Sequence, residues 1–207
     1  LHRQFGGDPW CIYRGLHLLS FADNHDVSRL ASILSDPGCI RPAYGLLFGM
    51  PGIPCVYYGS EWGQEGQKGG GDDWALRPAF DAPNELTAWV GRLIGARTGR
   101  DELGALAPGA RALCYGSYRN VQIASEQLLF ERVAESWDGQ PGERVLVAVN
   151  ASGQPASVQA GELNGSFRPL GGRRLGGRRG CAERCARARP VRDALSARML
   201  SMVHPVG

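Results

Sequence analysis

The chain has 207 residues, a formal net charge of +3 and 43% hydrophobic residues, so it is long and apolar enough to bury a sizeable core. It opens at Leu1 with no charged leader and contains no long apolar run, so we expect neither a signal peptide nor a membrane span.

The first patterned stretch places polar chemistry directly after a strand. Leu18 to Phe21 are apolar or small, as in a short buried strand, and Asp23, Asn24, His25 and Asp26 follow almost at once. Ligands meet the carboxyl ends of strands in parallel sheets. Two carboxylates, an amide and an imidazole there could bind a polyhydroxylated ligand, hold a metal or serve acid-base chemistry. The alternative is a polar turn that caps the next helix.

A second strand follows after helical material. Residues 27–34 and 43–50 have helical spacing of their apolar residues, and Ile53 to Tyr58 form an apolar and aromatic run. That run ends at Gly59 and is soon followed by Glu61. The order strand, helix, strand predicts a βαβ unit with two parallel strands and a right-handed crossover.

Two motifs here resemble those of a known family. Residues 21–26 resemble the F-x-x-N-H-D motif of glycoside hydrolase family 13, the α-amylase family, and residues 52–61 resemble its G-x-P-x-x-Y-Y-G-x-E motif. The resemblance implies strands seven and eight of a (β/α)8 barrel, with the site at its carboxyl-terminal face. Residues 27–29 and 43–50 look most like the maltodextrin-degrading, neopullulanase or cyclomaltodextrinase-like branch.

A complete barrel alone needs about 250 residues, so we expect a carboxyl-terminal fragment. The expected fold class is α/β: the last part of a TIM barrel in residues 1–110, followed by an incomplete all-β antiparallel sandwich domain in residues 111–170. Residues 171–207 form an Arg/Gly-rich tail, expected to be disordered or the product of a frameshift.

After the second motif comes a glycine-rich loop over residues 62–77, and then a helix that Asn84 is suited to cap. The apolar residues of this predicted barrel helix share one face: Leu86, Trp89, Val90, Leu93 and Ile94. Beyond it the apolar period becomes two, which predicts strands separated by turns at residues 119–120 and 139–142. These strands are expected over residues 112–118, 121–125, 127–133 and 144–150.

The charge of the chain is concentrated in the tail. Residues 171–198 hold nine arginines against Glu183 and Asp193, a net +7, which leaves −4 for the remainder. Such clustered guanidinium groups could form a nucleic-acid arm. We favour a frameshift in a GC-rich gene, because the predicted sandwich lacks its last strands where the composition changes.

The six cysteines show no disulfide-scaffold spacing, which predicts reduced thiols and a cytoplasmic protein. Cys181 and Cys185 have only His204 downstream, too few ligands for a zinc site. Calcium is common in the family, but its usual ligands lie in segments that this chain lacks, so we expect no cofactor and no metal.

The resemblance assigns roles to five residues. Asp26 corresponds to the third catalytic carboxylate of the family, which holds sugar hydroxyls at the reacting ring. His25 would donate to a hydroxyl of the same sugar, and Asn24 belongs to the same substrate-binding motif, chiefly to orient it. Asp73 and Arg77 resemble a D-x-x-x-R-P element that meets further sugars, with a surface ion pair as the alternative.

The neighbouring aromatic residues have weaker assignments. Tyr57 and Tyr58 are expected mainly in the barrel core, with at most one ring reaching the site, and Glu61 is expected to order the loop. Trp62 and Trp74 could stack on sugar faces, but tryptophans in glycine-rich loops also pack for stability.

The predicted function is a retaining glycoside hydrolase acting on α-glucosidic linkages of maltodextrins or related oligosaccharides. The nucleophile and the general acid would come from strands four and five, so this chain alone is expected to be inactive. One alternative is a non-catalytic carbohydrate-binding or transporter-associated relative, and another is a basic-tailed RNA-binding protein. We expect an α-glucan partner without nucleic acid or membrane, and leave open the oligomeric state of the parent and the choice between hydrolysis and transglycosylation.

Overall fold

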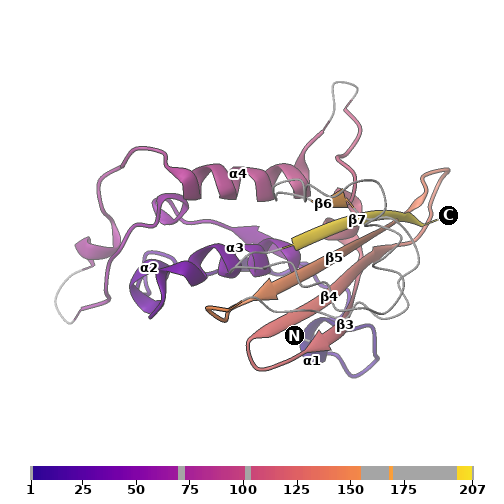
Figure 1. Cartoon of the computed structure of the whole chain (residues 1–207), viewed down its shortest axis with the longest axis horizontal. Helices are drawn as coiled ribbons and strands as arrows, with labels where there is room; N and C mark the ends of the chain where they lie inside the picture. The colour runs from indigo at the N-terminus through magenta and orange to yellow at the C-terminus, as the bar shows by residue number, and fades with distance from the viewer. Residues whose placement is uncertain (1, 70–72, 101–103, 155–167, 170–199, 207) are drawn as a thin grey trace.

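The computed structural model describes residues 2–69, 73–100, 104–154, 168–169 and 200–206. Its helical half and its antiparallel sheet pack against each other (Figure 1). The first half contains α1 His2–Phe5, β1 Leu19–Phe21, α2 Leu30–Ile33, η1 Pro37–Cys39, α3 Ile40–Gly49, β2 Ile53–Cys55, η2 Ser60–Trp62, η3 Trp74–Leu76 and α4 Glu85–Thr98. The second half contains α5 Ala110–Tyr115, β3 Ser117–Ile123, β4 Gln127–Ala134, β5 Gly142–Asn150, β6 Arg168–Pro169 and β7 Leu200–Val206.

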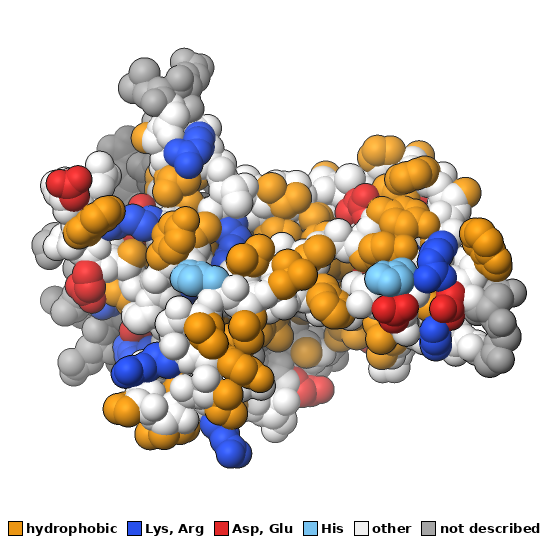
Figure 2. All heavy atoms as spheres, turned by 180° about the vertical axis from the view of Figure 1, so that it is seen from behind, with side chains coloured by type: hydrophobic (Ala, Val, Ile, Leu, Met, Phe, Trp, Pro, Cys, Tyr) orange, Lys and Arg blue, Asp and Glu red, His pale blue; other side chains and the backbone are white. Residues whose placement is uncertain are grey.

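The predicted strand, helix, strand order is confirmed. Strands β1 and β2 pair in parallel, with Leu19 opposite Ile53 and Phe21 opposite Cys55. Their predicted burial is wrong, because Leu19, Phe21 and Ile53 are 62%, 48% and 52% exposed. In the described part of the chain these strands form a two-stranded sheet, so no third strand covers their side chains. Seen from behind, the molecule carries hydrophobic side chains across the middle of its surface (Figure 2).

Helices α3 and α4 lie side by side and supply much of the core (Figure 1). The predicted cap of α4 is confirmed, since the Asn84 side chain accepts hydrogen bonds from the backbone N–H groups of Leu86 and Thr87 in a capping box. Four of the five residues on its predicted apolar face are buried: Leu86, Trp89, Val90 and Leu93. Ile94 is instead 45% exposed, because it lies at the edge of that face.

The second half is one antiparallel sheet in the order β3-β4-β5-β7-β6. Strands β4 and β5 correspond to the predicted strands over residues 127–133 and 144–150, and pair from Gln127 opposite Asn150 to Ala134 opposite Glu143. The sheet approaches the end of α3 so closely that a Cβ on Gly49 would lie 2.9 Å from a methyl carbon of Val147. Glycine at position 49 therefore permits the contact between the two halves.

One predicted strand is wrong over residues 112–115, and one predicted turn is wrong. Residues 110–115 form helix α5, which begins after Gly109 in a left-handed conformation and buries the adjacent Ala112 and Leu113. Burial of adjacent residues suits a helix packed against the core and not a period-two strand. The turn expected at residues 119–120 is instead an irregularity inside the continuous strand β3, where the register shifts between Asn120 and Gln122.

The expectation of a disordered tail over residues 171–207 is wrong for residues 200–206, which form strand β7. Strand β7 pairs antiparallel with β5, from Gly142 opposite Val206 to Ala148 opposite Leu200, and with the short β6. The arginine-rich residues 171–198 lie outside the described residues, as do Cys181 and Cys185. A second sheet, which a sandwich requires, is not among the described residues, so the sandwich remains a prediction.

Two buried arginines bind the carboxyl end of α3. Arg97 of α4 donates to the carbonyl oxygens of Phe48, Met50 and Gly52, with N–O distances of 2.5 and 3.1 Å for the first two. Arg132 of β4 donates to Gly49 O at 2.9 Å. The last carbonyls of a helix have no partner within it, and the helix dipole favours a cation there. These side chains therefore join α4 and the sheet to the same helix end.

Arg132 also donates to the carbonyl oxygens of Gly116 and Ser117, at 2.9 and 3.3 Å. It is 1% exposed, and this burial lowers the pKa of Arg132 to about 9. Three carbonyl dipoles from two segments of the chain, the end of α3 and residues 116–117, thus surround its positive charge.

Replacing Arg132 with Met should lower the free energy of unfolding by about 3 kcal/mol, because buried carbonyls lose their donors while the apolar stem stays packed. Urea unfolding measures the change. The control is Arg92→Met on the exposed face of α4, where the guanidinium lies 5.3 Å from the Trp89 ring centre and the expected loss is below about 1 kcal/mol. Equal urea midpoints for the two variants would contradict this role of Arg132.

Candidate functional site

A tight turn follows β1 and presents two polar side chains to solvent. The Asn24 carboxamide oxygen accepts a hydrogen bond of 2.8 Å from the backbone N–H of Asp26. The side chains of His25 and Asp26 are 51% and 63% exposed, and His25 Nε2 lies 3.2 Å from an Asp26 carboxylate oxygen. The turn thus places an imidazole and a carboxylate together in the open, with Asn24 shaping the backbone beneath them.

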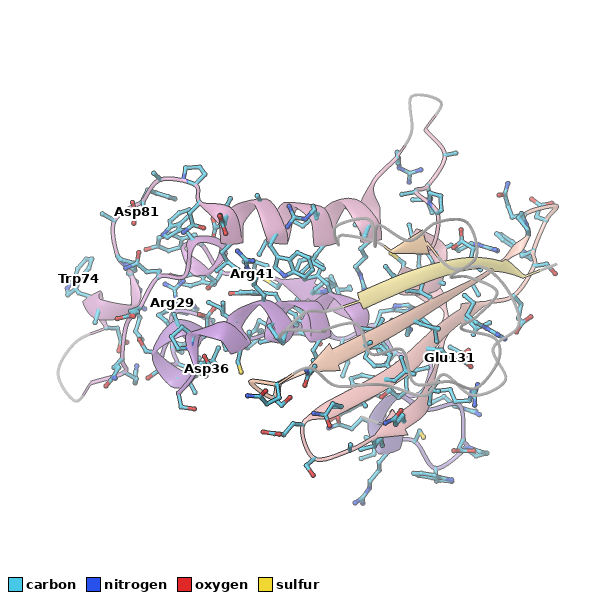
Figure 3. All side chains as sticks on the ribbon, viewed as in Figure 1. Arg29, Asp36, Arg41, Trp74, Asp81 and Glu131 are labelled. Carbon is cyan, nitrogen blue, oxygen red and sulfur yellow. The ribbon has the colours of Figure 1, made fainter. Side chains whose placement is uncertain are left out.

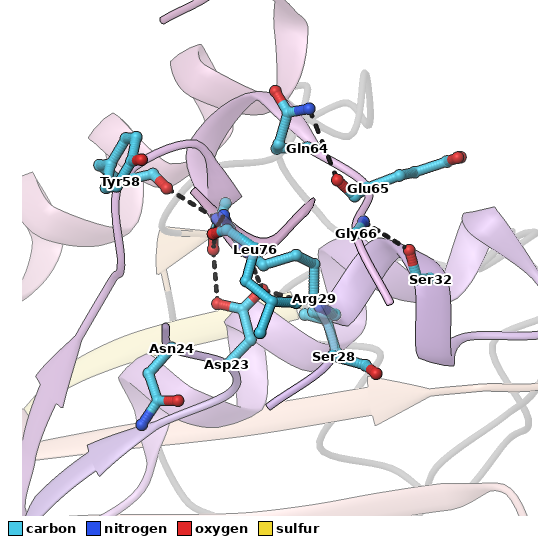
Figure 4. A network of polar contacts seen from close by, with 12 residues as sticks. Asp23, Asn24, Ser28, Arg29, Ser32, Tyr58, Gln64, Glu65, Gly66 and Leu76 are labelled. Carbon is cyan, nitrogen blue, oxygen red and sulfur yellow. Dashed lines mark hydrogen bonds and ion pairs between the residues drawn. The ribbon is translucent and has the colours of Figure 1, made fainter. Parts of the chain in front are cut away.

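The turn is anchored by a buried ion pair (Figure 4). Asp23 and Arg29 are 2% and 0% exposed, and Arg29 Nε donates to Asp23 Oδ2 at 3.2 Å. The same oxygen accepts from the backbone N–H of Leu30 at 2.7 Å, and the Ser60 hydroxyl donates to Asp23 Oδ1 at 2.5 Å. A buried charge pair is stable only when such further hydrogen bonds satisfy it. Asp23 is therefore fully engaged in the scaffold, unlike the exposed Asp26.

Arg29 binds several segments that are distant in sequence. Its guanidinium donates to Tyr58 O at 2.7 Å, to Leu76 O at 3.0 Å and to the Ser60 hydroxyl at 2.9 Å. It also lies over the Tyr57 ring, 4.8 Å from the ring centre. Figure 3 shows Arg29 within the helical end of the molecule. One side chain therefore fixes the turn after β1, the segment after β2 and the end of η3.

The glycine-rich loop packs tightly against this arginine. A Cβ on Gly66 would lie 2.2 Å from the carbonyl oxygen of Ala75, and Gly66 O accepts from the backbone N–H of Arg29 at 2.8 Å. Gly59 has a φ of 88°, a conformation that favours glycine. Gly66 therefore allows a close backbone approach, and Gly59 allows a left-handed turn before η2.

Aromatic rings run from His25 along the same surface. Ring centres lie 6.0 Å apart for His25 and Tyr57, 4.7 Å for Tyr57 and Tyr58, and 5.3 Å for Tyr58 and Phe80. Trp62 is next, 6.1 Å from Phe80. Both tyrosines are half-buried, while Phe80 is 80% exposed. Trp74 is also exposed and points away from the ribbon at the end of the molecule (Figure 3).

Asp73 and Arg77 form part of a charged group near His25. Asp73 accepts a hydrogen bond of 2.6 Å from Lys68 Nζ, and its other carboxylate oxygen lies 3.8 Å from Arg77 Nη1. The bond from Lys68 lowers the pKa of the Asp73 carboxyl, with smaller electrostatic contributions from Arg77 and His25. The ion pair considered as an alternative is present, and all these side chains are at least partly exposed.

This arrangement offers hydrogen-bonding groups beside exposed aromatic rings. Hydroxyl-rich ligands use both, because their O–H groups bind carboxylates and imidazoles while their C–H faces pack on rings. Within the described residues, no group of three or more His, Cys, Asp or Glu is placed to hold a metal ion. The described part of the chain also has no helix long and apolar enough to cross a membrane.

Sequence reasoning missed the roles of Arg29, Ser60 and Phe80. The opposite charges of Asp23 and Arg29, six residues apart around the motif, were a signal for the buried pair. Ser60 offered none apart from its place beside Gly59 in the second motif. Phe80 follows a loop whose path the sequence does not define, so its position beside Tyr58 and Trp62 could not be anticipated.

Lysine at position 29 should not replace arginine, because one ammonium group cannot reach acceptors on Asp23, Tyr58 and Leu76 together. We expect Arg29→Lys to lower the free energy of unfolding by about 3 kcal/mol, measured by urea unfolding. The control, Arg41→Lys, alters an exposed ion pair with Glu85 and should change the free energy of unfolding by less than about 0.5 kcal/mol. A stability loss no larger than the control's would show that Arg29 does not anchor the turn.

Comparison with known proteins gives related answers from sequence and structure. Residues 14–104 match the family model described as "Alpha amylase, catalytic domain". A 4-alpha-glucanotransferase of Thermotoga neapolitana is 41% identical over 51 residues, which are 23% of this chain and 11% of that protein. The chain therefore spans a small part of the length of this curated relative.

Solved structures show the same fold. An Anoxybacillus alpha-amylase aligns with a TM-score of 0.61 at 22% identity, over 92% of this chain and 38% of that one. The gamma-CGTase of alkalophilic Bacillus clarkii aligns with a TM-score of 0.59 at 18% identity, over 90% of this chain and 26% of that one. At these identities the likeness concerns the fold alone.

Proposed function

We propose, from the match of residues 14–104 to the α-amylase catalytic-domain model, that this chain provides one side of a carbohydrate site in a glycoside hydrolase or transferase acting on α-glucans. The observation that carries the proposal is the turn after β1. It presents the carboxylate of Asp26 and the imidazole of His25, 3.2 Å apart and exposed, at the carboxyl end of a parallel strand pair.

In this proposal Asp26 binds hydroxyl groups of the sugar at which the glycosidic bond breaks. A carboxylate makes charge-assisted hydrogen bonds, about twice as strong as neutral ones. Such bonds strengthen as the ring flattens and develops positive charge, so they stabilise the transition state more than the bound substrate. His25, held beside Asp26, donates to a hydroxyl of the same sugar, and the Asn24 side chain fixes the turn that carries both.

Asp73 and Arg77 extend the proposed site. The hydrogen bond from Lys68 lowers the pKa of Asp73, so this carboxyl is ionised at neutral pH and can accept from sugar hydroxyls. Arg77 lies close enough to share an ion pair with it and has further N–H donors. These groups would contact a sugar unit next to the one bound by Asp26.

We further propose a retaining mechanism with maltodextrins or related oligosaccharides as substrates. A retaining reaction needs a carboxylate nucleophile and a general acid, which would come from other barrel strands of a longer protein, so this chain alone would not be catalytic. The barrel portion would comprise residues 1–110 and the all-β domain residues 111–170. Hydrolysis and glucanosyl transfer share the glycosyl-enzyme intermediate, and the relatives named above include a glucanotransferase and an amylase.

The cellular setting belongs to the same proposal. Cys39, Cys55 and Cys114 are free thiols in the structure. Their state supports a reducing compartment such as the cytoplasm. We propose no metal or organic cofactor for the residues described.

Replacing Asp26 with Asn should weaken maltotriose binding by about tenfold, because a charge-assisted hydrogen bond contributes about 1.5–3 kcal/mol. Isothermal titration calorimetry on the 207-residue chain measures this. The matched control is Asp138→Asn, in the exposed hairpin between β4 and β5, where a φ of 49° suits asparagine as well as aspartate. Equal affinities for wild type and Asp26→Asn would remove Asp26 from the proposed site.

A further inference from the structure

We infer that the exposed ring of Phe80, supported by Tyr58 and Trp62, is a stacking platform for an additional glucose unit of an α-glucan. The inference rests on the proposed function, because it extends the site around Asp26 to a longer stretch of the same polysaccharide chain. Phe80 lies between η3 and α4, outside both sequence motifs.

The platform has one open side and two supporting rings. Phe80 is 80% exposed, although its ring centre lies 5.3 Å from that of Tyr58 and 6.1 Å from that of Trp62. A single exposed apolar residue on a protein surface carries no meaning by itself. Here the tilted contacts with two half-buried rings define the position of Phe80 and leave most of it uncovered, as aromatic ligand-binding surfaces require.

The backbone on both sides of Phe80 is held in place. The Tyr58 hydroxyl donates to the carbonyl oxygen of Pro78 at 3.1 Å. On the other side, the Asn84 carboxamide donates to the carbonyl oxygen of Trp62 at 2.8 Å while its oxygen caps α4. A ring on such a segment is positioned before a ligand arrives, which lowers the entropy cost of binding.

The platform is continuous with the candidate site. The rings of Tyr57 and Tyr58 lie between His25 and Phe80, and each step between neighbouring ring centres is 6.0 Å or less. A sugar stacked on Phe80 would therefore be a different unit from the one at Asp26, although both could belong to one oligosaccharide. The chemistry suits a pyranose, whose C–H face covers an aromatic ring while its hydroxyl groups remain at the polar rim.

The test compares a short and a long α-glucan on the full 207-residue chain. Dissociation constants for maltose and maltoheptaose are measured by calorimetry for wild type, Phe80→Ala, Phe80→Tyr and Asp26→Asn. We expect Phe80→Ala to raise the dissociation constant of maltoheptaose about fivefold and that of maltose by less than about twofold. Phe80→Tyr should bind both sugars like wild type, because it keeps the ring. Asp26→Asn should weaken the binding of both sugars.

The control is Trp137→Ala, which removes a comparably exposed ring from the hairpin between β4 and β5 and should leave both affinities unchanged. If Phe80→Ala binds maltoheptaose as well as wild type while Asp26→Asn weakens both sugars, the platform is refuted and the proposed function stands. An equal loss of maltose and maltoheptaose in Phe80→Ala also refutes a separate subsite. If wild type binds neither sugar, the proposed function fails together with this inference.

Discussion

The shape of the candidate site depends on the buried ion pair between Asp23 and Arg29. Both side chains are almost completely removed from water, which costs several kcal/mol per ion unless their hydrogen-bonding groups are satisfied. The structure meets this requirement with acceptors from two other segments: Tyr58 O and the Ser60 hydroxyl after β2, and Leu76 O in η3. The same bonds that stabilise the charge hold the turn of His25 against the aromatic segment after β2. The buried pair of Asp23 and Arg29 therefore both stabilises this part of the fold and positions the turn that carries His25.

The segments next to β1 and β2 pack against a core that the helices and the antiparallel sheet form together. Helices α3 and α4 pack on the antiparallel sheet, and Arg97 and Arg132 bind the carbonyl groups at the end of α3. The opposite side of the pair leaves Leu19 and Ile53 exposed. Parallel strands are normally covered on both faces, so the β1–β2 pair has the composition of a sheet interior, yet among the described residues it has no further strand beside it. This supports the proposal that further barrel strands complete it.

The sequence predicted the elements whose signals are local. The strand, helix, strand order and the cap at Asn84 follow from short-range patterns, and both are observed. Helix α5 was missed because it has six residues, of which Ala110, Ala112 and Leu113 are buried, and so short a segment contains less than two helical turns from which to read a period. The partners of Arg29 and the exposed ring of Phe80 depend on how distant loops pack, which no local pattern encodes. Strand β7 was missed because it follows the arginine- and glycine-rich residues 171–198, whose composition does not predict a strand.

The most direct measurement is a crystal structure of the 207-residue chain with a bound maltooligosaccharide. We expect a glucose unit whose hydroxyl oxygens lie about 2.7–3.0 Å from the Asp26 carboxylate and the His25 imidazole, with Arg29 still hydrogen-bonded to Asp23 beneath them. A well-ordered sugar bound elsewhere, with both exposed side chains free of contact, would contradict it.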